Sequence, residues 1–202
     1  MLAAHLVPGY FAAVASQPQW GSEWGGRRRA LLWVAALGST VAPDLDVVHN
    51  ILFRGFFNHN LLWTHSLFVH LSIVLCWWLL HRIGRWPYLQ TLVGLMVVGG
   101  LSHLVLDVVA HSTPLLYPFS LMMFGIPPAR IVEGGVWAYM TDPLFLLEPL
   151  FLTLAAAHWT LSRKPTPRVR TLTLVVLTSG LVSFTVIFLL LLPMLQTAAA
   201  GS

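Results

Sequence analysis

The residues best suited to chemistry are histidines and aspartates that recur inside otherwise apolar segments. The stretch from Gly99 to Ser120 contains His103, Asp107 and His111, each four residues from the next. At about 3.6 residues per turn, this spacing places the three side chains on one stripe of a helix. Imidazole nitrogens and a carboxylate oxygen on one face form a ligand set that suits Zn²⁺ or a similar divalent ion. We therefore expect all three to be metal ligands.

Further side chains of metal-ligand type come from separate parts of the chain. His5 lies near the start, Asp44 and Asp46 follow Pro43, and His65 lies at the head of an apolar run. Proline tends to end a helix before it, so both carboxylates can point inward from a helix end. We expect His5, Asp44 and His65 to bind metal. Asp44 and Asp46 are also the candidate catalytic residues, one binding metal and the other supporting a ligand or acting as base.

The same residues have an alternative interpretation, a hydrogen-bonded polar network without metal. In that network His65 or His103 would pair with Asp46 or Asp107. An ionised Asp at the centre of a membrane helix costs on the order of 2.5–3.5 kcal/mol. Structural zinc sites show apparent binding free energies of about 10–16 kcal/mol, which would outweigh that cost. The energetics favour metal.

Membrane helices are the elements that must position these residues. Of the 202 residues, 57% are hydrophobic and 9% charged, and the mean hydropathy of +0.77 lies outside the range of soluble domains. Runs of the length needed to cross a bilayer are Leu61–Leu80, Tyr88–Ala110, Pro143–Leu161 and Leu172–Leu195, and shorter apolar segments are Leu2–Ser16 and Ala30–Pro43. We predict an all-α polytopic bundle of about six transmembrane or membrane-embedded helices.

We predict that residues 1–202 form a single integral membrane domain. Its motif-bearing half is 1–120, an interfacial outer connection covers 111–142, and two spans cover 143–195. With six spans, nine of the eleven Lys and Arg residues share one face, and only Arg54 and Arg130 lie on the other. The positive-inside rule makes the first face cytoplasmic. The sequence thus predicts a multi-pass inner-membrane protein whose site faces the extracytoplasmic side, and this charge pattern favours six spans over four.

The remaining histidines are predicted to have other roles. We expect His70 to be a hydrogen-bonded helix residue and His81 and His158 to be interfacial, while the roles of His49, His59 and Glu148 stay open. Cys76 is the single cysteine, so no intrachain disulfide can form.

Taken in order, these pieces resemble a known family. The early His5, Pro43–Asp46 (Pro-Asp-x-Asp), Thr64–Ser66 (Thr-His-Ser), Leu101–Asp107 (Leu-Ser-His-x-x-x-Asp) and Thr113–Phe119 are similar to motifs of bacterial membrane-bound metal-dependent hydrolases. That group includes inner-membrane hydrolases described as LexA-binding. The resemblance covers roughly residues 1–120.

One motif departs from the family pattern. The family commonly has His-Arg-Gly-x-Thr-His-Ser, and Asn60 stands where its first His would be. His59, one residue earlier, is the alternative. The family's Arg is also missing, so a cation facing a phosphate would come from Arg54 or Arg130. Within the outer connection we expect Arg130 and Tyr117 to contact substrate.

The resemblance implies a reaction. The family is distantly similar to zinc-dependent phospholipases C and single-strand nucleases, which implies hydrolysis of a phosphoester or phosphodiester by a metal-activated water. Zinc is the expected metal, as one or more ions, and a membrane lipid is the expected substrate. Nucleic acid is not expected, because it would need an exposed basic groove that the outer face lacks. The alternatives are an ion or lipid transporter and a non-catalytic membrane protein stapled by metal.

Overall fold

The computed structural model describes residues 4–54, 63–110, 112–125, 147–162, 166–175, 177–182 and 185. The chain divides into two compact units, Met1–Ile131 (the first unit) and Val132–Ser202 (the second unit). Within the described ranges the regular structure is helical, apart from one isolated antiparallel bridge between Thr113 and Phe124. The all-α class is confirmed, and the single membrane domain stays a prediction.

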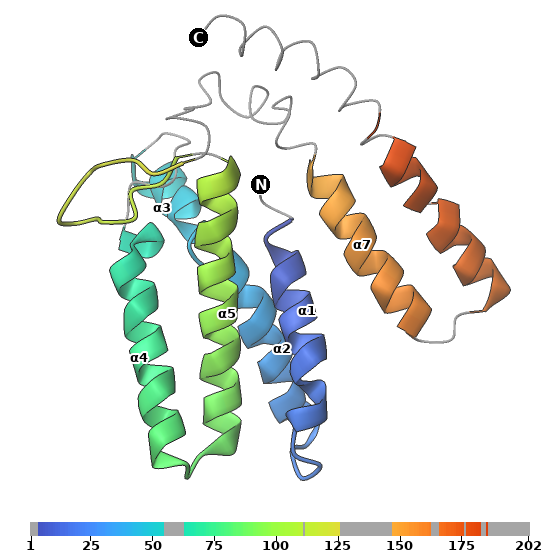
Figure 1. Ribbon diagram of the computed structural model, residues 1–202, viewed down its shortest axis with the longest axis horizontal. Helices are drawn as coiled ribbons and strands as arrows, with labels where there is room; N and C mark the ends of the chain where they lie inside the picture. Colours follow the sequence, from blue (N-terminus) through green and yellow to red (C-terminus); the bar gives the residue numbers. More distant parts are fainter. Residues whose placement is uncertain are drawn as a thin grey trace, which may run out of the picture. The chain divides into compact units, whose positions relative to one another are not determined.

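The described residues of the first unit form five α-helices, whose arrangement Figure 1 shows. They are α1 (Leu6–Ser16), α2 (Gly26–Val41), α3 (Leu45–Arg54), α4 (Leu67–Ile83) and α5 (Pro87–Ala110), with 3-10 turns η1 (Gln17–Gln19) and η2 (Trp63–His65). Helix α5 packs against α1, α2 and α4, and α1 packs against α2. The start of α4, the end of α5 and α3 gather at one end of these helices, and the α1–α2 and α4–α5 turns lie at the other.

Local sequence signals set the helix ends. Helix α2 ends at Val41, two residues before Pro43, as expected ahead of a proline. Ser66 caps α4, because its hydroxyl accepts a hydrogen bond from the backbone N–H two residues later. Gly84 follows α4 with φ of 68°, a left-handed conformation that favours glycine, and Pro87 begins α5. The α4–α5 connection is therefore a short, tight turn.

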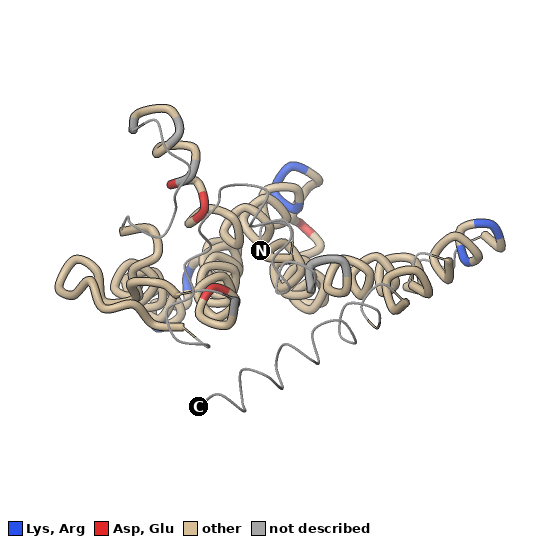
Figure 2. The backbone as a smooth tube through the Cα atoms, turned by 90° about the horizontal axis from the view of Figure 1, so that it is seen from above, with Lys and Arg blue, Asp and Glu red and all other residues tan. Residues whose placement is uncertain are grey.

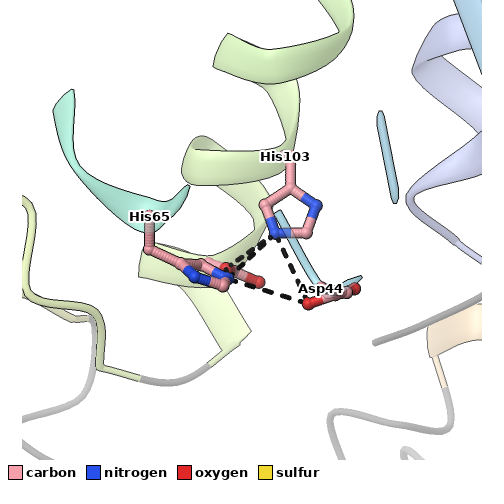
Figure 3. Close-up of side chains that lie close together, drawn as sticks. Asp44, His65 and His103 are labelled. Atoms are coloured by element: carbon pink, nitrogen blue, oxygen red, sulfur yellow. Dashed lines mark hydrogen bonds and ion pairs between the residues drawn. The ribbon is translucent and has the colours of Figure 1, made fainter. Parts of the chain in front are cut away.

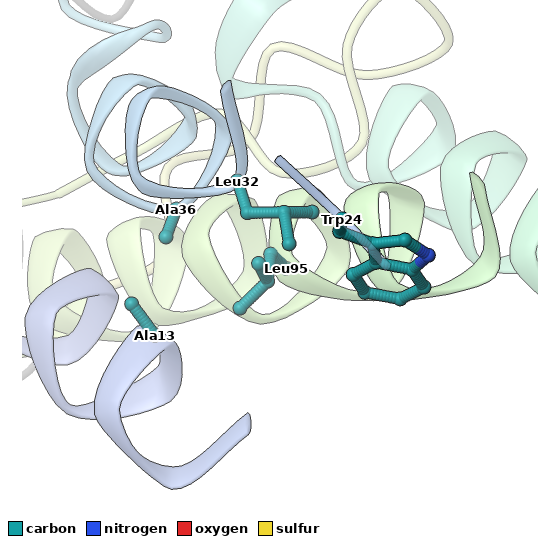
Figure 4. Packing of buried hydrophobic residues seen from close by; sticks show 5 residues of the cluster. All are labelled: Ala13, Trp24, Leu32, Ala36 and Leu95. Atoms are coloured by element: carbon teal, nitrogen blue, oxygen red, sulfur yellow. The ribbon is translucent and has the colours of Figure 1, made fainter. Parts of the chain in front are cut away.

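The apolar core of the first unit is small. Ala13, Trp24, Leu32, Ala36 and Leu95 are at most 4% exposed and pack where α1, α2 and α5 meet (Figure 4). Charged residues occupy few positions along the backbone (Figure 2). On α4, large apolar side chains remain exposed, including Leu71, Leu75, Trp77, Trp78 and Leu79. An apolar surface on this scale is typical of a protein that contacts lipid.

One described helix is long and apolar enough to cross a bilayer. Residues Pro87–Val109 of α5 have a mean hydropathy of 2.1 over their best window. The apolar helices Leu67–Ile83 and Leu150–Ser162 are shorter. Each predicted apolar segment contains helix in its described residues, although the segment Leu61–Leu80 begins with the turn η2 and becomes α-helical only at Leu67; the six-span count is not confirmed.

Helix α3 was not expected from the sequence. Its polar side chains Asp46 and Asn50 are buried, whereas Leu45, Leu52 and Phe53 are more than 60% exposed. This arrangement reverses the apolar-inside pattern by which surface helices of soluble proteins are identified. The helix turns its polar face toward the cluster described below.

The second unit is described in part. Helix α7 (Leu147–Ser162) matches the predicted segment Pro143–Leu161, and residues 167–175 and 177–182 are also helical. A Cβ added at Gly180 would lie 2.7 Å from Thr153 Oγ1, so the helical segment 177–182 is in direct contact with α7. The later part of the predicted span Leu172–Leu195 lies outside the described residues.

Candidate metal centre

Four buried side chains form a compact group at one end of the first unit, which we call the four-donor cluster: Asp44, His65, His103 and Asp107. Figure 3 labels three of them, Asp44, His65 and His103. One donor atom of each residue lies within 4.8 Å of all the others. Asp44 is 8% exposed and the other three are fully buried. The cluster joins the α2–α3 turn, the turn η2 and helix α5, so residues far apart in sequence converge on one point.

Five of the six separations among the donor atoms are close to those of a tetrahedral ligand shell, and the sixth, between Asp44 and Asp107, is within 4.8 Å. His103 Nε2 lies 3.1 Å from Asp107 Oδ2, 3.4 Å from His65 Nε2 and 3.6 Å from Asp44 Oδ1. His65 Nε2 lies 3.3 Å from Asp107 Oδ2 and 3.7 Å from Asp44 Oδ1. A tetrahedral ion with bonds of about 2.0–2.2 Å places its ligands roughly 3.3–3.6 Å apart. Two imidazoles and two carboxylates at these separations fit a divalent ion such as Zn²⁺.

Helix α5 supplies two donors from consecutive turns. His103 and Asp107 are four residues apart, so both side chains face the same direction. The Nδ1–H of His103 donates a hydrogen bond of 2.7 Å to the backbone carbonyl of Thr40 on α2. A carbonyl only accepts, so Nδ1 carries the proton and Nε2 offers its lone pair to the cluster.

A carboxylate supports His65 from the opposite side of its ring. Asp46 Oδ2, in the first turn of α3, lies 3.4 Å from His65 Nδ1, and the Thr64 hydroxyl lies 3.2 Å from the same nitrogen. Contacts of this kind fix the tautomer and orientation of metal-binding histidines. The next residue, Ser66, connects the start of α4 to the segment after α5. Its hydroxyl caps α4 and donates a hydrogen bond to the backbone carbonyl of Tyr117.

His5 lies beside the cluster rather than within the four donors. Its Nδ1 is 3.5 Å from Asp44 Oδ2 and its Nε2 is 3.3 Å from Asp107 Oδ1. These are the carboxylate oxygens that the tetrahedron leaves unused. The His5 ring also stacks on His103, with 4.1 Å between ring centroids. His5 therefore joins the two aspartates, and metal ligation by this residue stays a prediction.

The electrostatics of the cluster favour a cation. Asp44 lies in the turn between α2 and α3. Burial alone would raise the pKa of its carboxyl, but the neighbouring His5 and His65 side chains lower that pKa below its usual range. Asp44 is therefore ionised at neutral pH, the state that binds metal. Together with Asp46 and Asp107 it places three carboxylates in a buried site, where a divalent ion would compensate their charge.

Two glycines on α5 allow its neighbours to approach the cluster. A Cβ at Gly99 would overlap the Ser39 hydroxyl on α2, and one at Gly100 would lie 2.5 Å from the His70 ring on α4. Small residues of this kind let membrane helices pack closely. His70 is buried, and its Nδ1 donates to the carbonyl of Ser66 at 2.9 Å. The predicted role of His70 as a hydrogen-bonded helix residue is confirmed.

Other predicted site residues have different positions. His111, Arg130, His59 and Asn60 lie outside the described residues, as do the side chains of Arg54 and Glu148. Tyr117 contributes its backbone carbonyl to Ser66, and substrate contact by this residue stays a prediction. His49 is exposed on α3 beside Phe53, and the exposed His81 stacks on Trp77.

Three buried residues, two of them next to or within the elements that carry the site, had no chemical role assigned from the sequence. Thr40 holds His103 through a backbone carbonyl, which no side-chain pattern reveals. Asn50 is fully buried one turn after Asp46. Its spacing of four residues from Asp46 was the sequence signal that both side chains lie on one helix face. Thr113 is fully buried and lies in the isolated bridge with Phe124.

Comparison with known proteins identifies a family. The model of the YdjM inner membrane protein family matches residues 1–196. No curated protein and no solved structure matches the chain. The family match covers both units, including every residue of the four-donor cluster. The chain therefore belongs to the YdjM inner membrane protein family.

Proposed function

We propose that this protein is a metal-dependent hydrolase that cleaves a phosphoester or phosphodiester bond of a membrane lipid. The observation that carries the proposal is the buried tetrahedron of donors from Asp44, His65, His103 and Asp107. A bound divalent ion would lower the pKa of a water ligand and polarise a phosphoryl oxygen, which is the chemistry that this reaction needs.

The chain's own residues have distinct parts in this proposal. His65 and His103 present Nε2, while Asp46 and the Thr40 carbonyl hold the far nitrogens of those rings. Two roles remain for Asp46. As a positioning residue it orients His65, and as a base it would accept the proton of the attacking water. Its contact with His65 Nδ1 supports the first role.

A cavity beside the cluster supports an apolar substrate portion. It has a volume of about 210 Å³ and a mostly apolar lining that includes Pro43, Thr64, Val69, Ile73, Met96 and Gly100. Pro43 directly precedes Asp44 and Thr64 directly precedes His65, so the lining includes the sequence neighbours of two donors. No Lys or Arg is among its lining residues. Part of an acyl chain fits such a lining better than a nucleic acid does.

A second candidate is a structural metal staple without activity. All four donor positions of the tetrahedron come from protein side chains, as in structural zinc sites, whereas catalytic zinc sites leave one position to water. In this alternative the metal would hold the α2–α3 turn, η2 and α5 together and no lipid would be cleaved.

The test uses the purified full chain loaded with Zn²⁺ and a panel of phospholipids, with release of the phosphorylated head group as the readout. We expect turnover that chelation abolishes. The variant Asp107→Asn should lose more than the roughly 10–100-fold that removing a supporting contact costs. His81→Gln, a histidine remote from the cluster, is the matched control and should retain activity. Metal binding without turnover would favour the staple, and flux across liposomes without hydrolysis would favour a transporter.

A further inference from the structure

A second cavity lies at the end of the first unit opposite the four-donor cluster. It has a volume of about 370 Å³ and is formed where the α1–α2 connection meets the α4–α5 turn. Its lining includes Trp24, Arg28, Arg85, Trp86, Tyr88 and Leu89. From Tyr88 to His103 the rise along α5 is about 22 Å, so this cavity is separate from the metal centre.

The cavity is positively charged. Arg28 and Arg85 come from different elements, and no acidic residue is among the lining residues. In the part of the chain that the structure describes, neither arginine forms an ion pair with Asp or Glu. Arginine presents a planar set of donors that matches the oxygens of a phosphate. Two arginines that line one cavity and have no acidic partner among the described residues favour an anionic ligand.

Aromatic contacts hold one side of this cavity in place. The Arg28 guanidinium lies 5.6 Å from the centre of the Tyr88 ring, and the Tyr88 hydroxyl donates to the Arg28 carbonyl at 3.3 Å. Trp24 is 4% exposed and packs edge-to-face against Tyr88. These contacts join the start of α2 to the start of α5. Arg28 and the Tyr88 ring are therefore held in position in the absence of a ligand.

An apolar surface continues from the charged cavity. Trp86 is 51% exposed and Leu89 is 38% exposed, and both line the cavity. Tryptophan and tyrosine are enriched where membrane helices meet head groups, and basic pockets between such helices bind anionic lipid heads. The cations can bind either a lipid phosphate or a free phosphate. The exposed apolar side chains of Trp86 and Leu89 favour the lipid, because a free phosphate has no apolar part to contact them.

We propose that this cavity binds the head group of an anionic phospholipid, with Arg28 and Arg85 at the phosphate and Trp86 and Leu89 against the acyl chains. This site is independent of the proposed hydrolase. It lies at the end of the first unit where Arg27, Arg28 and Arg29 begin α2 and Arg85 precedes α5, and a bound lipid there would link the α1–α2 and α4–α5 turns.

The test is native mass spectrometry of the full chain in detergent, titrated with dioleoyl phosphatidylglycerol. Each arginine near an anionic lipid contributes enough for about a fivefold change in affinity, so R28Q and R85Q should each lose about fivefold and the double variant about 25-fold. The control R168Q/R170Q removes two exposed cations from the second unit and should bind like the wild type. The midpoint of thermal unfolding of each variant in detergent should match that of the wild type, which reports that the first unit remains folded.

Three results would overturn the proposal. The first is equal binding of dioleoyl phosphatidylcholine, which lacks net charge. The second is an equal loss in R168Q/R170Q, which would show general attraction to a cationic surface. The third is displacement of the lipid by inorganic phosphate at matched concentration, which would identify free phosphate as the ligand. The charge-preserving variant R28K/R85K should recover most of the binding.

Discussion

At the residue scale, the cluster depends on how each imidazole is held. His103 is fixed by a backbone carbonyl and His65 by the Asp46 carboxylate, so both present Nε2 to the same point. The donors themselves were predictable, because His-x-x-x-Asp places two ligands on one helix face and Asp44 follows a helix-ending proline. The Thr40 contact was not predictable, because a backbone carbonyl is present at every residue and only tertiary packing selects one.

The two roles of Asp46 can be separated by substitution. Asp46→Asn removes the charge beside His65 Nδ1, and we expect the Kd for Zn²⁺ to rise about 10–100-fold, as for other supporting contacts of metal-binding histidines. Competition with a chromophoric chelator measures this Kd. Glu23→Gln, an exposed acid outside the cluster, is the control. Unchanged metal affinity combined with lost hydrolysis would contradict the positioning role and assign Asp46 as base.

At the element scale, close packing of α5 against α2 and α4 brings the donors together. Helix α5 was predictable from its length and hydropathy, but α3 was not, because its apolar residues face outward and its polar residues face the site. A pattern read with the assumption of an apolar interior assigns such a segment to a loop. The packing role of Gly99 and Gly100 was also not predictable, because it depends on which side chains of α2 and α4 lie against them.

Glycine substitutions test this packing directly. Gly100→Ala would place a Cβ 2.5 Å from the His70 ring, and overpacking of this kind costs about 1–3 kcal/mol. We expect a lower midpoint of thermal unfolding in detergent and weaker metal binding. At Gly38 on α2 an added Cβ meets nothing within 4 Å, so Gly38→Ala should keep or slightly raise the midpoint. Equal midpoints for the two variants would refute a packing role for Gly100.

At the scale of the whole molecule, charge differs between the two ends of the first unit. Arg27, Arg28 and Arg29 begin α2 and Arg85 precedes α5, whereas the aspartates of the cluster lie at the other ends of these helices. The positive-inside rule then predicts a cytoplasmic arginine end and an extracytoplasmic metal centre.

Thiol labelling of intact cells tests this orientation. In a Cys76→Ala background, Ser22→Cys lies in the connection between α1 and α2, and Leu121→Cys lies in the exposed loop after α5. A membrane-impermeant maleimide should label Leu121→Cys in spheroplasts and Ser22→Cys only after lysis. The reverse pattern would place the metal centre on the cytoplasmic side.

Metal content is the most direct measurement of the central claim that four side chains hold one divalent ion. Elemental analysis of the purified full chain after exposure to Zn²⁺ should find close to one tightly held ion per chain, and His65→Ala/His103→Ala should hold none. His49→Ala/His81→Ala, which removes two exposed histidines, should hold as much as the wild type. A wild-type chain without bound metal, or a double variant of the cluster that retains it, would contradict the account.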